Sequence, residues 1–309
     1  IVGAVQGKDY ILILTDTAAY IMQYVGPPFT FSIRQVGSDC GAIGQHSIVY
    51  ANGVVFWMGA TGGFFMFDGS VKTVPCLVED FVFTTQGNNL GVNYDTGSEL
   101  VEAGHNALFN EVSWFYPQNS ATQIDRTVTY NYLEQVWTTG TLARTSWANA
   151  DIFDLPYATQ LDTANKPDFP TINGVSNGRS ILYEQETGTN QVRSFTTGTV
   201  TTAISSSIKS GDFDLDVDGD GQYYMSVRRF IPDFKNLNGT ANVTIYLRRF
   251  PNDTATGSPL GPFTVSTSTQ QIWTRARSRL ASFEVSADEL NGTWRYGLFR
   301  FDSRPDGMR

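Results

Sequence analysis

The sequence predicts an all-β protein, and three observations support that class. Apolar residues occur in runs of four to eight that are rich in Val, Ile, Thr, Phe and Tyr, a length and composition typical of strands. Gly, Asn, Asp or Pro closes almost every run, and these are the residues that favour turns. Apolar spacing with a helical period is nearly absent. The 309 residues are enough for one large β domain or two ordinary domains.

Consecutive hairpins are predicted through the first part of the chain. The dipeptide Asn52-Gly53 separates two short runs, and Asn-Gly between alternating strands is the strongest short-range signal for a hairpin. Asp68-Gly69 has the same role between the next two runs. We therefore expect neighbouring strands to pair as a meander rather than a Greek key. The predicted strands are residues 10–14, 19–23, 47–51, 54–58, 64–67, 71–74, 106–116, 126–132, 136–138, 152–155 and 180–184.

These hairpins recur in loose blocks of about 40 to 50 residues, which is typical of the blades of a propeller. The pattern favours a β-propeller-type hairpin array. A sandwich made of the same hairpins stays open as the alternative. Residues 156–180, which contain Pro167 and Pro170, are expected to connect two blades.

A second β domain is expected to follow a stretch rich in Thr and Ser at residues 195–204. We therefore divide the chain into a propeller-type domain at residues 1–195 and an Arg-rich, β-sandwich-like C-terminal domain at residues 196–309. Because the chain begins with Ile1 rather than Met, we expect the N-terminal portion of the full protein to be absent. The strands predicted in the second domain are residues 223–231, 243–250, 263–266, 271–284 and 294–301.

The charge of the chain is divided unevenly. The net charge is −9, but residues 1–227 carry −14 and residues 228–309 carry +5. An acidic total argues against a protein that coats nucleic acid by charge alone, because phosphate binding needs clustered Lys and Arg. The asymmetry indicates that the acidic part and the basic tail have different roles.

Sequence motifs for catalysis and cofactor binding are absent. The chain has two histidines, His46 and His105, in different predicted hairpins, and no nucleophile elbow, zinc-protease motif or P-loop. Its two cysteines are too few for a disulfide framework or a Cys-based zinc site. Residues 40–67 lack charge but are broken by Gln, Asn and Gly, so no membrane-spanning segment is expected. We expect neither an enzyme nor a cofactor.

An alternating acidic run lies ahead of the basic tail. From Asp214 the pattern resembles the first half of a calcium loop, with Gly219 at the turn, but Met225 occupies the place of the bidentate Glu. A solvated turn is therefore favoured over a Ca²⁺ or Mg²⁺ site. The weaker metal hypothesis would use Asp214, Asp216, Asp218 and Asp220.

Arginines recur at alternate positions in the tail. On a strand, Arg275, Arg277 and Arg279 would project from one face about 7 Å apart. Such a row repels itself unless it meets carboxylates, a neighbouring subunit or phosphates, and Arg suits bidentate pairing. Pairing within the chain, with residues such as Glu284 and Asp302, stays open beside a subunit contact and direct contact with DNA. The candidate interface residues are Arg228, Arg229, Arg275, Arg277, Arg279 and Arg300.

Several aromatic-rich segments resemble the tail nozzle proteins of short-tailed bacteriophages, which are also named head or DNA stabilisation proteins or tail tubular protein B. The matching segments spread over most of the chain in the family's order. They are QYVGPPFTFSIRQVGSDCGAIG (23–44), VVFWMG (54–59), FFMFDG (64–69), NEVSWFYP (110–117), VTYNYLEQVWTTGTLARTSW (128–147), MSVRRFIPDF (225–234), TRARSRLASFEV (274–285) and WRYGLFRFDSRPDGMR (294–309).

The resemblance implies a propeller-containing virion protein that forms a homo-hexameric ring below the portal and adaptor proteins. Such a ring extends the DNA channel, retains the packaged genome, and passes double-stranded DNA during ejection. The resemblance also implies tail fibre or needle proteins as partners, and a location in the virion tail after assembly in the host cytoplasm. It implies no catalytic residues.

Two other functions stay open. A receptor-recognising or glycan-binding propeller module of a tail is favoured by aromatic residues that we expect to be exposed, such as Trp114, Trp137 and Trp147. A phage polysaccharide depolymerase would need a pair of carboxylates, and the sequence singles out no such pair.

Overall fold

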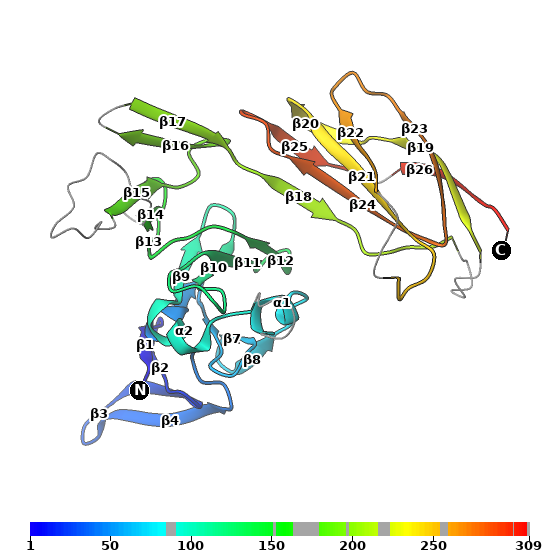
Figure 1. Cartoon of the computed structure of the whole chain (residues 1–309). Helices are drawn as coiled ribbons and strands as arrows, with labels where there is room; N and C mark the ends of the chain where they lie inside the picture. Colours follow the sequence, from blue (N-terminus) through cyan, green and yellow to red (C-terminus); the bar gives the residue numbers. More distant parts are fainter. Residues whose placement is uncertain are drawn as a thin grey trace. The chain divides into compact units, whose positions relative to one another are not determined.

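The computed structural model describes residues 1–84, 91–150, 153–162, 179–195, 198–215, 223–253, 259–298 and 300–307 (Figure 1). These residues form small antiparallel sheets with two short α-helices, so the predicted all-β class is confirmed. The chain divides into two compact units, Ile1–Thr187 and Gly188–Arg309. Each unit is described by itself. No helix within the described ranges is long and apolar enough to cross a membrane.

The first unit consists of sheets whose strands follow chain order. Each of the first three sheets is a four-stranded antiparallel meander, as predicted from the hairpin signals. The three-stranded sheet that follows has the same order. The strands are β1 (Gly3–Gln6), β2 (Ile11–Leu14), β3 (Ala18–Gly26) and β4 (Thr30–Ser38); β5 (Ile48–Ala51), β6 (Val54–Met58), β7 (Phe64–Phe67) and β8 (Val71–Val74); β9 (Glu102–Asn106), β10 (Glu111–Tyr116), β11 (Arg126–Asn131) and β12 (Val136–Gly140); and β13 (Ser146–Ala148), β14 (Tyr157–Asp162) and β15 (Arg179–Glu184).

The first strands of successive sheets lie beside one another. Strand β5 contacts β1 and β9, and β9 contacts β13. Within the part of the chain that the structure describes, no sheet closes into a barrel and no closed propeller forms.

The turn chemistry explains the local pairing. Asn52 has φ 47° and Gly53 has φ 88°, and positive φ at both central residues is what the favoured two-residue hairpin turn requires. Gly69, in the turn between β7 and β8, has φ 120°, which only glycine adopts without strain.

Large aromatic side chains fill the interior of the first unit. Trp57 and Trp114 are fully buried. The Trp57 indole N–H donates to the carbonyl of Cys40 at 2.8 Å, and the Trp114 indole N–H donates to the carbonyl of Ser47 at 2.9 Å. Each buried ring therefore keeps its polar atom satisfied. The helices α1 (Glu79–Phe83) and α2 (Tyr94–Leu100) follow the second sheet, and the 3-10 turn η1 (Gln45–Ser47) precedes it.

Three predictions in the first unit were wrong. The run 106–116, predicted as one strand, contains the last residue of β9, a turn at residues 107–110 and β10, and β9 and β10 pair with each other. Residues 153–155 form bends rather than the end of a strand, and residue 152 lies outside the described residues. The segment 156–180, predicted as a connecting loop, contains β14, which pairs with both β13 and β15. Pro167 and Pro170, which suggested the loop, lie outside the described residues, but Tyr157–Asp162 form a strand, and Ala158 is buried.

The second unit pairs strands that are distant in the chain. One sheet has the order β18-β24-β21-β22 and another the order β23-β19-β26, and hydrophobic residues from both form one core. Two smaller pairs are β16–β17 and β20–β25. The strands are β16 (Asn190–Phe195), β17 (Gly198–Ala203), β18 (Ser206–Lys209), β19 (Met225–Ile231), β20 (Phe234–Asn238), β21 (Ala241–Arg248), β22 (Leu260–Val265), β23 (Ile272–Ser278), β24 (Leu280–Ala287), β25 (Thr293–Tyr296) and β26 (Arg300–Pro305).

Two long predicted strands are each divided in the structure. The run 271–284 becomes β23 and β24, which belong to different sheets and meet at Arg279. The run 294–301 becomes β25 and the start of β26. A chain that changes sheet at a corner keeps its apolar alternation on both sides, so periodicity alone did not reveal the break.

The boundary between the units falls before the hairpin β16–β17. The sequence placed it at residue 195, whereas the compact units meet between Thr187 and Gly188. Asn190 and Asn291 join this hairpin to the rest of the second unit. The Asn190 side chain donates to Asn291 Oδ1 at 2.7 Å and accepts from the Asn291 backbone N–H at 2.9 Å.

Candidate subunit interface

The exposed side of β23 presents the predicted arginine row. Ile272, Thr274, Ala276 and Ser278 are buried, whereas Trp273, Arg275 and Arg277 between them are exposed. Strict alternation is the period of a strand with one face in the core. The predicted projection of Arg275 and Arg277 from a single face is therefore confirmed.

A β-bulge brings two further arginines to the same side. The pairing of β19 with both neighbours shifts between Val227 and Arg229, so Arg228 is an extra residue. Val227 and Phe230 are both buried although three positions separate them. A regular strand would turn either Arg228 or Arg229 toward the core, and the bulge removes that conflict.

Strand β26 completes this surface. Arg300, Asp302 and Arg304 alternate with Phe301, which packs against the core, and Asp302 lies directly opposite Arg229. We call the outward side of β23, β19 and β26 the arginine face. Its six arginines are Arg228, Arg229, Arg275, Arg277, Arg300 and Arg304.

Three of the six arginines pair with carboxylates inside the unit. Arg229 lies 3.6 Å from Asp302, and Arg300 lies 3.5 Å from Asp233. Arg277 Nε donates to Asp306 Oδ2 at 2.6 Å, and its Nη2 donates to the Asp306 carbonyl at 3.0 Å. These side chains are one-third to three-fifths exposed on the arginine side, and exposed pairs each contribute about 0–1 kcal/mol. The pairs orient the arginines more than they stabilise the fold.

Two arginines of the predicted row, Arg277 and Arg279, pack against aromatic rings. The guanidinium carbons of Arg277 and Arg279 lie 4.3 Å and 5.0 Å from the ring centre of Tyr224. Arg279 also lies 4.9 Å from the ring of Phe250. Arg279 is half-buried at the corner after β23. It therefore forms part of the structure of its own unit rather than of the exposed row.

The other three arginines of the face remain available to a partner. Arg228, Arg275 and Arg304 are exposed, and none forms an ion pair or side-chain hydrogen bond with another described residue. Uncompensated cations at this spacing repel one another. A surface that supplies carboxylates would relieve that repulsion.

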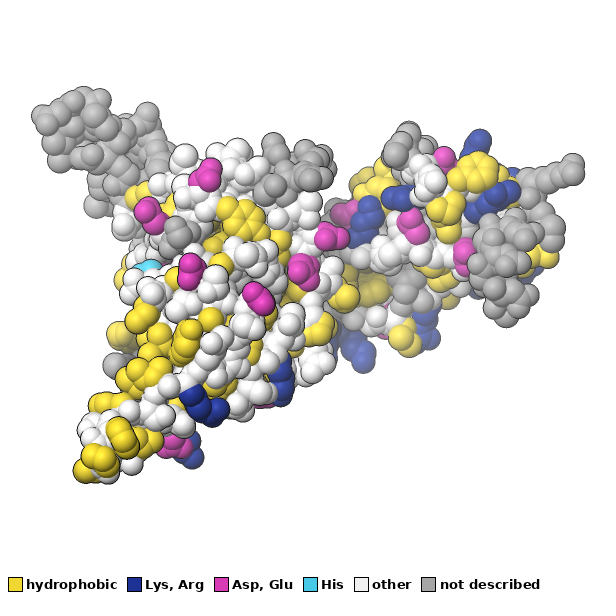
Figure 2. Space-filling view, turned by 90° about the horizontal axis from the view of Figure 1, so that it is seen from below, with side chains coloured by type: hydrophobic (Ala, Val, Ile, Leu, Met, Phe, Trp, Pro, Cys, Tyr) yellow, Lys and Arg dark blue, Asp and Glu magenta, His cyan; other side chains and the backbone are white. Residues whose placement is uncertain are grey.

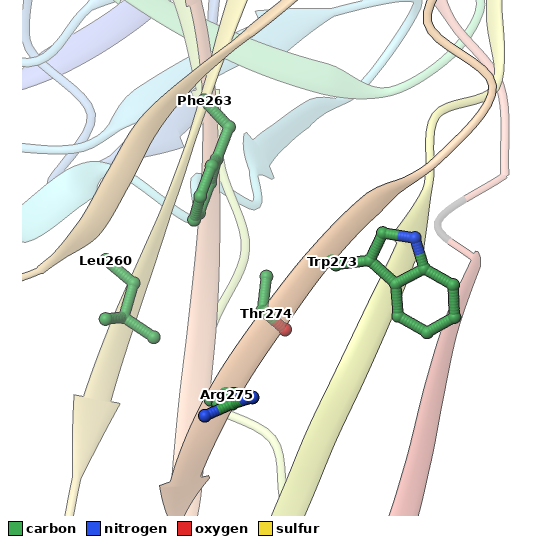
Figure 3. Close-up of a pocket in the computed structure, with 5 residues that line it drawn as sticks. All are labelled: Leu260, Phe263, Trp273, Thr274 and Arg275. Carbon is green, nitrogen blue, oxygen red and sulfur yellow. The ribbon is translucent and has the colours of Figure 1, made fainter.

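Arg275 also borders a pocket of about 430 Å³ (Figure 3). Leu260 and Phe263 of β22 line one side, and Thr274 and Arg275 of β23 line the other. Trp273 adds a ring that is 66% exposed. Strands β22 and β23 are the edge strands of their sheets, so an extended acidic segment could lie along this groove and place a carboxylate on Arg275.

The first unit carries the opposite charge. It has 7 Lys and Arg against 18 Asp and Glu, a net charge of −11. Helix α1 contributes Glu79 and Asp80, and α2 contributes Asp95 and Glu99; all four are exposed. None of the four forms an ion pair with a described residue. Figure 2 shows acidic side chains spread over one face of this unit.

The first carboxylate of the acidic run forms an ion pair within the second unit. Asp212 lies 3.1 Å from Arg248, and Phe213 and Leu215 pack against the core of the second unit. Asp214 is described, whereas Asp216, Asp218 and Asp220 lie outside the described residues. Among the residues that the structure covers, no group of three His, Cys, Asp or Glu is placed to hold a metal ion.

The tryptophans expected to be exposed are not. Trp114 is fully buried, and Trp137 and Trp147 are half-buried. Trp137 donates to the carbonyl of Pro75 at 2.8 Å and stacks 4.5 Å from Tyr130, and Trp147 donates to the carbonyl of His105 at 3.1 Å. The sequence shows that these rings lie on strands but does not show which face is buried. None of the three rings has the exposure that the glycan-binding hypothesis expected.

Each histidine has a polar side chain as a close neighbour. His105 Nε2 lies 3.2 Å from the hydroxyl of Tyr132, and exposed His46 lies 3.8 Å from Glu102. Burial is the main cause that raises the pKa of Glu102, and His46 opposes it.

Three residues of the interface were missed by the sequence reasoning. Trp273 shares the alternation of Arg275 and Arg277, so the same period would have placed it on their face. Tyr224 and Asp306 join the site through hydrogen bonds between their backbones, with the Asp306 N–H donating to the Tyr224 carbonyl at 2.7 Å. No short-range signal reveals that pairing.

Comparison with models of protein families finds no match to the chain, and comparison with curated proteins finds none either.

Proposed function

We propose that the protein is a structural component of a virion, the ring-forming tail nozzle of a short-tailed bacteriophage. In this proposal six copies form a ring that continues the channel of the portal and adaptor proteins. The ring retains the packaged genome and passes double-stranded DNA during ejection, and it contacts tail fibre or needle proteins. No step of this function requires catalysis. The sequence segments quoted above provide the resemblance on which the proposal rests.

The sheet order supports a propeller-type first unit. A propeller blade is a four-stranded antiparallel meander, and neighbouring blades place their innermost strands around a common axis. Three successive four-stranded meanders with β1, β5, β9 and β13 in contact fit that arrangement. The shared core of the two larger sheets in the second unit fits a sandwich-like domain.

The observation that carries the ring is the arginine face. Arg228, Arg275 and Arg304 lack carboxylate partners among the described residues, while the first unit of the same chain has a net charge of −11. If the basic face of one copy meets an acidic surface of the next, the interface is heterologous, and such an interface gives a ring when its rotation closes. The exposed carboxylates of α1 and α2 are the acidic surface that we propose.

The acidic first unit also suits a channel for DNA. Duplex DNA carries a negative charge about every 1.7 Å, so a wall of like charge lets it pass without sticking. The excess of carboxylates in the first unit supports placing that unit toward the lumen.

The test is the mass and symmetry of the assembled particle. Native mass spectrometry and two-dimensional class averages of the wild-type chain should give a sixfold ring. Arg275→Glu should abolish the ring and leave a folded monomer, because Arg275 has no ion pair or side-chain hydrogen bond with a described residue that its loss would disturb. Lys235→Glu is the matched control: it reverses one exposed cation on β20, outside the arginine face, and should assemble normally.

Other results would count against the proposal. A wild-type chain that stays monomeric at high concentration and never docks on a portal–adaptor complex contradicts the nozzle. Equal assembly of Arg275→Glu and Lys235→Glu removes the arginine face from the interface.

A further inference from the structure

The hairpin formed by β3 and β4 ends in an exposed apolar tip. Strand β2 pairs with β3 only from Ala19 to Met22. From Gln23 onward β3 has only β4 as a neighbour, and β4 is the edge of its sheet. The hairpin therefore projects from the unit as a two-stranded ribbon (Figure 1).

Large apolar side chains gather on this ribbon. Phe29 is 81% exposed, Tyr24 69% and Ile33 62%. Val25 and Phe31 are also more than half exposed. Figure 2 shows the hydrophobic side chains collected at the pointed free end of the unit, at the lower left. Soluble proteins rarely leave such a group of side chains in water without a partner.

The register shows how these residues are arranged. Tyr24 lies opposite Phe31, and Met22 lies opposite Ile33, so these four side chains share one face of the ribbon. The rings of Tyr24 and Phe31 meet edge to face at 5.8 Å. Val25 is the extra residue of a bulge, and Phe29 lies in the turn. At the free end of the ribbon, apolar side chains therefore lie on more than one face.

The charge of the hairpin differs from that of the rest of the unit. Residues 17–38 contain one charged side chain, Arg34, in a unit with a net charge of −11. Arg34 is exposed and lies opposite Ile21, which is buried at the base of the ribbon. The tip is neutral, and the base carries a positive charge.

We propose that this hairpin inserts its tip into one leaflet of a lipid bilayer that contains anionic lipids. The three strand rises from Gln23 to Gly26 span roughly 10 Å. That length matches the 5–10 Å or so to which interfacial segments bury their apolar surface. Arg34 then lies at the level of the headgroups, where a cation is attracted to anionic lipid. The inference uses different residues from those of the proposed ring and does not depend on it.

A protein partner fits these observations less well. The five exposed side chains offer roughly 600 Å², given about 150–250 Å² for each aromatic side chain in full. Each partner of a stable protein interface contributes about 800 Å². A bilayer surrounds the tip and covers its apolar side chains whichever way they point, whereas a flat protein surface covers one face.

Flotation of the full chain with vesicles tests the inference. Vesicles of phosphatidylcholine mixed with phosphatidylglycerol should carry the wild type upward. Phe29→Ser combined with Ile33→Ser should weaken that binding about tenfold or more, because two exposed apolar side chains are lost. This variant keeps the contact between Tyr24 and Phe31. Arg34→Ala should weaken binding to the mixed vesicles about fivefold and leave binding to pure phosphatidylcholine unchanged.

Leu77→Ser combined with Leu133→Ser is the matched control. Leu77 and Leu133 are 95% and 65% exposed in the same unit but lie outside the hairpin, so this variant should float like the wild type. The inference is overturned if the wild type binds neither kind of vesicle. It is also overturned if the Phe29→Ser, Ile33→Ser variant binds vesicles as well as the Leu77→Ser, Leu133→Ser control does. If the hairpin variant instead changes the oligomeric state while no chain binds lipid, the hairpin is a protein contact. Thermal unfolding of each variant checks that it is folded.

Discussion

The two units of this chain build their sheets in opposite ways. In the first unit each strand pairs with its neighbour in sequence, so four sheets follow one another along the chain. In the second unit β18 pairs with β24, and β19 lies between β23 and β26. Local pairing leaves its turn signals in the sequence, whereas pairing between distant strands leaves only alternation.

The units also use their aromatic and charged residues differently. The first buries Trp57 and Trp114 completely, and it leaves the carboxylates of α1 and α2 exposed. The second leaves Trp273 exposed beside Arg275 and Arg277. In the first unit the two buried indoles and the exposed helix carboxylates thus lie apart, while the second unit places both kinds of residue at one candidate interface.

Because the two units have separate hydrophobic cores, a cavity made in one core should destabilise that unit and not the other. This is the largest change in stability that we expect. Trp114 packs 4.7 Å from the ring of Phe64 and lies in a core that shares no residue with that of the second unit. Trp114→Ala should cost the first unit about 3–5 kcal/mol in free energy of unfolding. Hydrogen exchange followed by mass spectrometry should show lost protection in peptides from residues 1–187 and unchanged protection in the rest.

Phe283→Ala is the reciprocal change. Phe283 is 2% exposed in the core of the second unit and stacks on Phe213 at 5.3 Å. It should lower protection in peptides from residues 188–309 by a similar amount and spare the first unit. Equal loss across the whole chain in both variants would mean that the two units unfold together.

What the sequence could predict follows the same division. Asn52-Gly53 marked its hairpin because both residues adopt positive φ, a requirement that is local. The outward projection of Arg275 and Arg277 followed from the period of a strand. The bulge at Arg228 and the hydrogen bond between Asp306 and Tyr224 could not be predicted, because they depend on β19 pairing with strands that come much later in the chain.

The choice of buried face was the other failure. Alternation shows that two faces differ, but it does not show which one another sheet will cover. We expected Trp114, Trp137 and Trp147 to face solvent, but packing of the neighbouring elements buries them fully or in part. Trp273 is the exposed tryptophan, and it lies in the second unit, for which the sequence predicted an arginine-rich surface.

A close approach between backbone and ring gives a prediction of intermediate size. A Cβ atom added to Gly104 in β9 would clash with the indole of Trp147, whose ring also stacks on Phe115 at 5.7 Å. Gly104→Ala should therefore displace the indole and cost about 1–3 kcal/mol. A red shift in tryptophan emission together with a lower urea midpoint would report this change.

Gly140→Ala is the matched control for that prediction. Its added Cβ would meet Thr127 Cγ2 at 3.1 Å, a contact that a small shift of one methyl group relieves. This variant should change stability by less than about 1 kcal/mol. If both variants lose stability equally, the cost reflects replacement of a strand glycine in general and not the packing of Trp147.

The smallest expected effect concerns the acidic character of the first unit. Burial raises the pKa of Glu111, and Glu186 and Glu134 raise it further; burial likewise raises the pKa of Glu186. A carboxyl whose pKa is higher in the folded than in the unfolded state adds stability below its unfolded value of about 4.3 and loses that contribution as pH rises through the folded value.

Glu111→Gln removes this cost, so it should stabilise the first unit at pH 7 by about 0.5 kcal/mol, allowing for solvent screening of a partly exposed group. At a pH below about 4 the wild-type carboxyl is protonated in both states, and the two proteins should unfold at the same urea concentration. Paired urea titrations at these two pH values provide the measurement. A variant that is less stable than the wild type at pH 7 would show that Glu111 has a favourable partner outside the described residues, and that the acidic surface of the first unit is compensated within the chain.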